Sequence, residues 1–496
     1  MSTSPGDSAR HQSYGRSVSV SDRGVARIDF SEGLQQWTDG SMQVRGHSAA
    51  DRNNIHVDIG HHIGYTVCRR PDGGDSAALR PSRMSAVFRL SLCAVGAGEQ
   101  AMKALEEAME RVIYLDNAAT TPVDPAVFEE MKPFFTERFA NPMTYMHSSA
   151  GDVAHTAVEE ARVRVASLIG SKPEQVVFTG GGTESDNWVL KGAVEKASRE
   201  RLHKPGHLVT AEFEHHAILH SALALQRQGY EVTFVKVGRS GIVDPDDVRR
   251  AMRPTTLLVS IMHANNEIGT IQPIADIARV AHENGALMHT DAVQTTAHIP
   301  VDVNALGVDF LSLSGHKFNG PKGVGILFVR DHAALYPFID GGGQEWGLRG
   351  STHNVPGIVG LGKAAQLGKE RLPGELERLT TLRTMLYDKL SARIDRIFLN
   401  GDMKQRVPQN LNIRIEGIDN EPLLLAMNEA GIIAAGGSAC NAEETLASHV
   451  LTSIGCDLKE AKSSIRLSFG YVTTEKDIDY AADVIPNLVK FLRSMA

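Results

Sequence analysis

The fold is decided by Ser312-Leu313-Ser314-Gly315-His316-Lys317-Phe318-Asn319-Gly320-Pro321-Lys322-Gly323. An apolar run ends here, a lysine follows it, and Gly-Pro-Lys-Gly then turns the chain. Open parallel sheets bind ligands at the carboxyl ends of their strands. A lysine in that place forms a Schiff base when it is desolvated or flanked by cations. The competing interpretation is an exposed lysine in an ordinary turn, and this stretch alone does not decide between the two.

Two other strand ends carry residues of matching chemistry. Asp291 ends the apolar run one strand earlier, and an acid there would keep the pyridine nitrogen of pyridoxal phosphate protonated. Thr183 opens a helix after Gly180-Gly181-Gly182, and backbone N–H groups at a helix start bind phosphate. Each has an ordinary alternative, because Asp and Thr also cap helices that bind no ligand. The three features together favour a pyridoxal-phosphate site more strongly than any one does.

The surrounding pattern alternates short apolar runs with helical stretches, which predicts an α/β fold with a mostly parallel sheet covered by helices. The run 323–329 follows its predecessor so closely that we expect it to be an antiparallel neighbour. Strands are predicted at 175–178, 207–210, 231–235, 256–260, 286–289 and 309–313, and helices at 152–168, 184–199, 217–228 and 273–284.

The C-terminal part has a different order of predicted helices and strands. A long charged helix is predicted from Glu370 to Arg396 with a break near Pro373, followed by strands at 411–415 and 464–468 with helices between them. We therefore predict a large domain over residues 111–364, whose first residues pack with the small domain, and a smaller α+β domain over residues 365–496.

Composition excludes several classes of protein. The 496 residues exceed what one hydrophobic core usually holds, and the 42% of apolar residues is typical of globular proteins. No apolar stretch approaches the roughly 20 residues of a membrane span. A net charge of −8 gives no support to nucleic-acid binding. Four scattered cysteines without a CxxC pair indicate neither a disulfide framework nor a zinc site, so no metal is expected and a reducing cytoplasm fits best.

Residues 1–110 differ from the rest of the chain. Ser, Gly, Asp and His are scattered there without a clear period, which favours disorder. The alternative is that the start codon is assigned too early, because Met109 stands just before the strand-like run 111–115.

From residue 112 onward the chain resembles the cysteine desulfurases of the NifS/IscS group, in the class V aminotransferase superfamily. The motifs occur in the order typical of that family, and nothing before Arg111 resembles it. The resemblance implies a pyridoxal-phosphate-dependent transferase of fold type I. The matching stretches are 114–122, 182–187, 265–269, 291–294, 314–323, 341–345, 437–440 and 463–466.

The resemblance also implies a role for individual residues near the cofactor. Lys317 is similar to the lysine that holds pyridoxal phosphate covalently, Asp291 to the partner of the pyridine nitrogen, and His215 to the histidine stacked on the ring, which also carries protons. Asn266 and Gln294 resemble the residues at the phenolic oxygen. The phosphate would be held by Gly182, Thr183, Ser314 and His316.

Two further residues resemble groups that act on other partners. Thr352 resembles the threonine that reaches the phosphate of the neighbouring subunit, which implies a homodimer. Arg466 resembles the arginine that binds the substrate carboxylate through a two-point pairing.

Cys440 differs from the other cysteines. It lies in a polar stretch, Gly436-Gly437-Ser438-Ala439-Cys440-Asn441, whereas Cys68, Cys93 and Cys456 are expected to be buried and inert. A mobile thiolate is the nucleophile that sulfur transfer needs, and the length of this stretch is similar to that of the NifS/IscS group. Three positions depart from the family pattern: Leu446-Ala447-Ser448, Ala435-Gly436, and Ser351 before Thr352. None of them removes a catalytic group.

The resemblance implies that L-cysteine is converted to L-alanine and that its sulfur becomes a persulfide on Cys440. The persulfide would pass to an acceptor protein, either an iron–sulfur scaffold or a tRNA-thiolation protein. No direct nucleic-acid or membrane partner is expected. Two alternatives stay open: a selenocysteine lyase with the same fold and cofactor, and a non-catalytic, partner-binding relic of the fold.

Overall fold

The computed structural model describes residues 112–200, 206–437 and 447–495, together with the backbone of five short strands before residue 112. The chain divides into two units, Met1–Arg111 and Val112–Ala496. In the first unit, β1 (Val18–Val20) pairs antiparallel with β2 (Ala26–Ile28). A second antiparallel sheet contains β3 (Gln43–Arg45), β4 (Asn54–Ile59) and β5 (Ile63–Cys68). The predicted disorder of residues 1–110 falls mostly on residues outside the described part.

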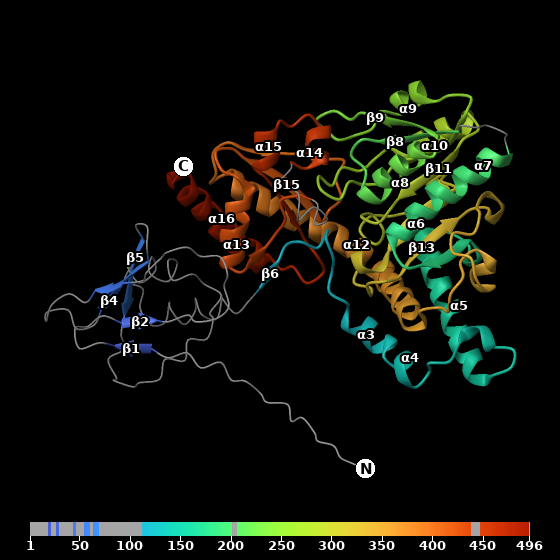
Figure 1. The fold of residues 1–496 in the computed structure, drawn as a ribbon, viewed down its shortest axis with the longest axis horizontal. Coiled ribbons are helices and arrows are strands. Elements are labelled where there is room, and N and C mark those ends of the chain that lie inside the picture. Colours follow the sequence, from blue (N-terminus) through green and yellow to red (C-terminus); the bar gives the residue numbers. More distant parts are fainter. Residues whose placement is uncertain are drawn as a thin grey trace, which may run out of the picture. The chain divides into compact units, whose positions relative to one another are not determined.

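The second unit is built on a seven-stranded sheet (Figure 1). Five neighbouring strands are parallel. At one edge a sixth strand is antiparallel to both of its neighbours, so that the last strand again runs in the direction of the five. This confirms the α/β fold and the antiparallel strand predicted at 323–329. In spatial order the strands are β7 (Val176–Thr179), β13 (Gly325–Val329), β12 (Phe310–Ser314), β11 (Leu287–Asp291), β10 (Thr256–Ser260), β8 (His207–Ala211) and β9 (Glu231–Val235).

Both faces of this sheet are buried, which explains why its strands are continuous apolar runs. Side chains alternate between the two faces of a strand. Val176 and Phe178 pack in one hydrophobic core, whereas Val177 between them packs in another. Helices α5 (Ser149–Ile169) and α10 (Ile274–Glu283) contribute to the first core. The second is covered by α8 (His216–Arg227) and by α6 (Gly182–Trp188), which continues through the π-helical turn Val189–Ala193 into α7 (Val194–Glu200).

Shorter helices complete this part of the chain. They are α3 (Pro125–Met131), α4 (Pro133–Thr136), α9 (Pro245–Ala251) and α11 (Val303–Leu306).

A separate hydrophobic core holds the C-terminal elements together. Its sheet places β15 (Asn410–Ile415) between β14 (Ile397–Leu399) and β17 (Ser464–Ser468), all antiparallel. The N-terminal strand β6 (Ile113–Tyr114) pairs with β16 (Ile432–Ile433), and Ile113 and Leu115 are buried in this core. The remaining helices are α13 (Asn420–Glu429), α14 (His449–Ser453), α15 (Leu458–Lys462) and α16 (Glu475–Met495).

The helix predicted from Glu370 is wrong in its limits. The observed α12 runs from Val355 to Ser391 and is continuous through Pro373 (Figure 1). The side chain of Asn354 caps its start, and its glycines allow close packing. A Cβ at Gly362 would lie 2.6 Å from the Cα of Ala161 in α5. The Gly-rich beginning hid the helix in the sequence, because glycine usually disfavours helices. The first half of α12 packs in the core that contains α5 and α10, and the second half packs in the core of the C-terminal elements.

None of the helices in the described residues combines the length and apolar character that a membrane crossing requires.

Candidate active site

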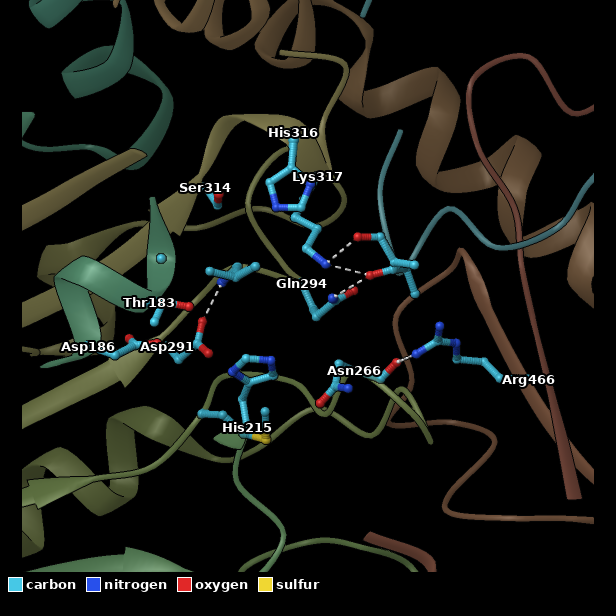
Figure 2. Close-up of a pocket in the computed structure, with 15 residues that line it drawn as sticks. Thr183, Asp186, His215, Asn266, Asp291, Gln294, Ser314, His316, Lys317 and Arg466 are labelled. Atoms are coloured by element: carbon cyan, nitrogen blue, oxygen red, sulfur yellow. Dashed lines mark hydrogen bonds between the residues drawn. The ribbon is translucent and has the colours of Figure 1, made fainter. Parts of the chain in front are cut away.

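A cavity of about 220 Å³ lies where β11, β12 and the start of α6 meet β17. Figure 2 shows Lys317 entering this space from one side and His215 from the opposite side. The cavity brings together ten residues that the sequence assigned to the site: Gly182, Thr183, His215, Asn266, Asp291, Gln294, Ser314, His316, Lys317 and Arg466.

The amine of Lys317 lies inside the cavity because a 3₁₀ turn, Gly315–Lys317, follows the end of β12. Its Nζ donates hydrogen bonds to the backbone oxygens of Ala118 and Ala119 at 2.7 and 2.9 Å. Gln294 Nε2 donates to the same Ala118 oxygen at 3.1 Å. The backbone of residues 118–119 therefore fixes where the lysine amine and the glutamine amide point.

Asp291 ends β11 and is buried. Its Oδ1 accepts the Val293 N–H at 2.8 Å. Burial raises the pKa of Asp291 to about 6, although the Val293 N–H and the charge of Lys317 act in the opposite direction. A second acid, Asp186, also lines the cavity, and burial together with the charge of Asp291 raises its pKa well above the ordinary value. The floor of the cavity therefore strongly favours a positively charged ligand group.

His215 caps α8, where its Nδ1 accepts the Ala217 N–H at 3.2 Å. Burial, followed by the charges of Lys317 and His216, lowers the pKa of His215 to about 4. The ring is thus neutral at pH 7. Because Nδ1 is the acceptor, the single ring proton is on Nε2.

Other residues that line the cavity supply groups suited to an anion. Gly182 and Thr183 form the first turn of the helical segment 182–200, and Ser314 ends β12. A Cβ at Gly182 would lie 2.8 Å from Val293 Cγ2, so a larger residue would displace the wall of the cavity. His316 Nδ1 lies 3.0 Å from the hydroxyl of Thr120, and burial lowers the pKa of His316 to about 4.

Arg466 lies on β17 and reaches the same cavity from the C-terminal three-stranded sheet. It is 1% exposed. One terminal nitrogen donates to Asn266 O at 3.0 Å and the other to Asp116 Oδ1 at 2.6 Å. The side-chain oxygen of Asn266 is buried and accepts no hydrogen bond from any described residue.

These residues fit pyridoxal phosphate. The amine of Lys317 lies within the cavity, and the buried carboxylate of Asp291 can pair with a cationic nitrogen. The buried side-chain oxygen of Asn266 has no donor among the described residues, and the first turn of α6 can bind an anion.

One of the remaining predicted residues lines a different cavity, and the other lies in a part of the chain that the structure does not describe. Thr352 lines a second cavity of about 220 Å³, which Thr179, Gly180, Glu345 and Arg349 also line. Cys440 lies outside the described residues. The chain on both sides of its segment is described, however.

The two ends of the cysteine segment are fixed beside the first cavity. The backbone of Ala435 pairs with that of Arg466 in both directions. On the other side, the Ser448 hydroxyl donates to Glu267 Oε2 at 2.5 Å. Glu267 directly follows Asn266, which lines the cavity. Residues 438–446 therefore leave and rejoin the described chain close to the site.

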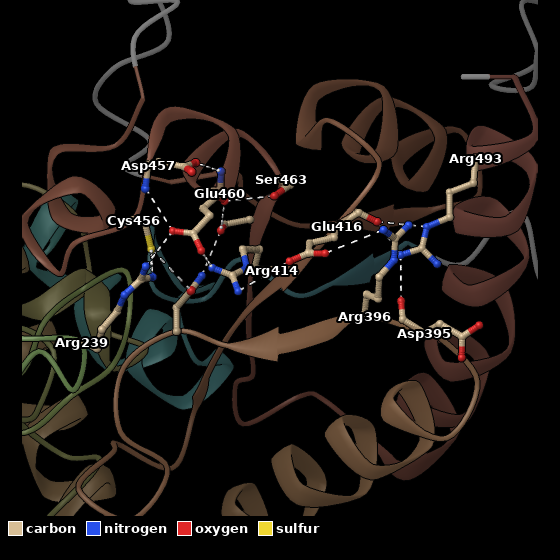
Figure 3. Close-up of polar contacts among 12 residues, drawn as sticks. Arg239, Asp395, Arg396, Arg414, Glu416, Cys456, Asp457, Glu460, Ser463 and Arg493 are labelled. Carbon is tan, nitrogen blue, oxygen red and sulfur yellow. Dashed lines mark hydrogen bonds and ion pairs between the residues drawn. The ribbon is translucent and has the colours of Figure 1, made fainter.

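Cys456 confirms the prediction of a buried cysteine, since it is 5% exposed. Figure 3 shows it beside Arg239, whose guanidinium donates to its sulfur at 3.3 Å. Burial raises the pKa of the Cys456 thiol. The neighbouring Glu460 pairs with Arg239 and Arg414, so this thiol is enclosed in a structural ion-pair network.

Sequence reasoning missed several residues of the site. Asp186 stands four residues after Gly182, which puts both on one face of a helix, and this spacing could have revealed it. Glu214 precedes His215, is fully buried and has a pKa that burial raises well above its ordinary value. Asp116 is 350 residues from Arg466, and only the fold brings the two together.

Comparison with known proteins places the chain in a family. The aminotransferase class-V family model matches residues 113–481. The chain is 44% identical over 388 residues to the cysteine desulfurase IscS of Dictyoglomus turgidum, covering 78% of this chain and 97% of that protein. It is 45% identical over 386 residues to the IscS of Methanosarcina thermophila, covering 78% and 94% respectively. The chain belongs to the cysteine desulfurases.

Solved structures agree with this membership. A NifS-like protein superimposes with a TM-score of 0.71 at 36% identity and covers 77% of this chain and all of its own. SspA, solved in complex with cysteine, gives a TM-score of 0.64 at 37% identity, with 73% and 100% coverage. The predicted fold type and the cysteine desulfurase activity are thereby confirmed. Cysteine desulfurases of this family depend on pyridoxal phosphate.

Proposed function

We propose that this cysteine desulfurase binds pyridoxal phosphate through Lys317 and receives the sulfur of L-cysteine on Cys440. One observation carries the proposal: Asp291 and Lys317, from the ends of β11 and β12, line one cavity with Arg466, from the middle of β17. When bound, pyridoxal phosphate supplies an electron sink for negative charge at the substrate α-carbon. Asp291 would pair with the pyridine nitrogen, Asn266 and Gln294 with the phenolic oxygen, and Gly182, Thr183, Ser314 and His316 with the phosphate.

The residues around the Lys317 amine have different roles toward the substrate. His215 is neutral and holds its proton on Nε2, so it offers the cavity a hydrogen-bond donor and has no acidic proton to supply at pH 7. The amine of Lys317 is then the base that takes the proton from the substrate α-carbon. Arg466 would bind the substrate carboxylate, which fixes the amino acid relative to Lys317.

Cys440 would complete the reaction as the nucleophile. Its thiolate attacks the substrate sulfur, so a sulfur–sulfur bond forms while the carbon–sulfur bond breaks. The electron pair of the broken bond stays on the substrate β-carbon, which takes up a proton, and alanine leaves. The fixed ends of the cysteine segment at Ala435 and Ser448 support this role, because three residues carry Cys440 at most about 11 Å from Gly437.

A second copy of the chain completes the proposed enzyme. Thr352 lies outside the first cavity, as expected of a residue that serves the phosphate site of a partner subunit. Large apolar side chains are exposed along the region from α3 to α5, where a partner would cover them: Phe128, Phe135, Phe139, Met143, Met146, Val153 and Val163. The persulfide would then pass to the thiol of an iron–sulfur scaffold or a tRNA-thiolation protein. The cytoplasmic location stays a prediction.

Two variants test the proposal. Lys317→Ala should lose the visible absorption of the covalently bound cofactor and all alanine release. Cys440→Ala should keep the cofactor and the spectral change on adding L-cysteine, because that chemistry needs no thiol. Its alanine release should fall by about three orders of magnitude or more, as expected when a covalent nucleophile is removed. Normal alanine release by Cys440→Ala, or an unchanged cofactor spectrum in Lys317→Ala, would contradict the assignment.

A further inference from the structure

Arg466 is held in place before any substrate arrives. It is almost completely buried, and its two terminal nitrogens donate to Asp116 Oδ1 and Asn266 O at 2.6 and 3.0 Å. Its Nε donates to no described residue. A guanidinium carries five N–H donors in one plane. Three of them are therefore left for a ligand, enough for a two-point contact with a carboxylate.

The residue that holds Arg466 is covalently close to the group that holds Lys317. Asp116 is two residues from Ala118, whose backbone oxygen accepts hydrogen bonds from Lys317 Nζ and Gln294 Nε2. The short segment between them is fixed on β17. Asn117 Nδ2 donates to Ser468 O at 3.0 Å, and the Ala118 N–H donates to the Ser468 hydroxyl at 2.9 Å.

The segment 116–118 thus sets the separation between the guanidinium of Arg466 and the amine of Lys317. In an α-amino acid, the amine and the carboxylate are bound to the same carbon. The distance between the Arg466 guanidinium and the Lys317 amine must therefore be held closely if the amine and the carboxylate of the substrate are both to be bound. We propose that Asp116 is a positioning residue that orients Arg466 toward the carboxylate of an α-amino acid and thereby gives the site its preference for such substrates. The inference rests on the proposed role of Arg466 as the carboxylate-binding residue.

Charge explains why an aspartate suits this position. A buried cation without a partner is unstable, and Asp116 compensates Arg466 while the cavity holds no substrate. Asp116 and the substrate carboxylate would use different N–H groups of the same guanidinium. Removing Asp116 should therefore weaken carboxylate binding, because the guanidinium loses its fixed orientation.

The test measures binding and turnover in the holoenzyme. Asp116→Asn keeps the shape of the side chain and removes its charge. The KM for L-cysteine and the Kd for the product L-alanine, read from the cofactor spectrum, should each rise by about tenfold, the size of a charge-assisted hydrogen bond, with a smaller change in kcat. Cysteamine, which is L-cysteine without the carboxylate, should bind as it does to the wild type. Asp116→Glu keeps the charge and should restore most of the L-alanine affinity.

A matched control uses the ion pair between Asp124 and Arg371, whose closest atoms are 2.7 Å apart. Asp124→Asn should leave the KM for L-cysteine and the Kd for L-alanine unchanged, provided that thermal unfolding shows both variants folded. Unchanged or tighter L-alanine binding by Asp116→Asn would overturn the inference, as would an equal loss of cysteamine binding.

Arg466→Lys separates this inference from the proposed function. If that variant keeps the wild-type preference for L-cysteine over cysteamine, Arg466 does not bind the carboxylate, and both ideas fall. If it loses the preference while Asp116→Asn keeps it, only the role of Asp116 is refuted.

Discussion

Two groups of buried carboxylates in this enzyme behave in opposite ways. In the cavity, burial raises the pKa of Asp291 to about 6 and that of Asp186 well above its usual range, and burial does the same to Glu214 next to His215. Glu345, in the wall of the second cavity, is equally buried. Burial alone would raise its pKa as well, but hydrogen bonds from Arg162 and His353 hold the pKa at about 2.

The difference is that the chain itself supplies hydrogen-bond donors and a counter-charge to Glu345. Glu345 accepts two hydrogen bonds from Arg162 at 2.8 and 2.9 Å, one from the Phe178 N–H and one from His353. Among the described residues, neither Asp291, Asp186 nor Glu214 forms an ion pair with an arginine or lysine. Glu345 therefore stabilises the fold, including the positive φ angles of Glu345 and Trp346, whereas the cavity acids favour a cationic ligand at a cost in stability.

The largest effect is expected for Asp291→Asn. This change removes the charge that would keep the pyridine nitrogen protonated, so alanine release should fall by about a thousandfold. The cofactor-free protein should unfold at the same temperature as the wild type or a higher one, because an uncompensated buried charge is lost. A clear drop in stability with near-normal activity would reverse the distinction between the two groups.

Glu345→Gln should show the opposite result, with a larger effect on stability than on alanine release. Arg162 would lose its buried counter-charge and keep only the half-exposed Glu159, so the free energy of unfolding should fall by about 3 kcal/mol in denaturant titrations. As a control, Glu184→Gln breaks a more exposed pair with Arg349 and should cost less than about 1 kcal/mol. Equal losses in the two variants would mean that the buried pair has no special role.

The stability of the cofactor-free protein should depend on pH with opposite signs in the two regions. The pKa of Asp291 rises from 3.8 to about 6 on folding, so its contribution is full below pH 3.8 and is lost as the pH rises to 6. For Glu345 the pKa falls from 4.5 to about 2, so its contribution is full above pH 4.5 and is lost as the pH falls toward 2. Each contribution amounts to about 3 kcal/mol.

Unfolding free energies of wild type and variants between pH 4 and 7 measure this directly. The advantage of Asp291→Asn over the wild type should grow with pH across that range, whereas the deficit of Glu345→Gln should be nearly constant above pH 4.5. Parallel curves for Asp291→Asn and the wild type would show that the aspartate does not titrate as the burial implies.

The smallest effect is expected for Cys456→Ala. This thiol belongs to the structural side of the comparison, enclosed by Arg239 and Glu460. Alanine release should stay within twofold of the wild type, and stability should fall by about 1 kcal/mol, typical of a small buried truncation. A persulfide mapped to Cys456 by mass spectrometry would contradict this.

The fold could be predicted from the sequence where local signals were strong. Strands buried on both faces are continuous apolar runs, and each strand predicted for the large sheet is present. The start of α12 was missed because Gly357, Gly360 and Gly362 look unlike a helix until their contacts with Met131 and Ala161 are known. Packing between distant segments, not local propensity, makes that stretch helical.

The site could be predicted where motifs name the residues. Ten assigned residues share one cavity, whereas the roles of individual residues, the homodimer and Cys440 stay predictions. The residues that were missed act through distant contacts. Asp116 reaches Arg466 and Glu345 reaches Arg162, across 350 and 183 positions of the chain. No pattern in a single sequence reports such pairs.

The pairing of β6 with β16 also has a consequence for how the enzyme is made. Residues 113–118 leave the ribosome before the rest of the unit Val112–Ala496, yet their partners at 432–433 and 466–468 are synthesised near the end. Contacts of such high sequence separation form late and slowly. The parallel sheet can therefore assemble during translation. The guanidinium of Arg466 reaches Asp116, next to the backbone oxygens that bind Lys317, only once synthesis is nearly complete. Arg466, the proposed carboxylate-binding residue, is thus absent from the cavity until the C-terminal strand has been made.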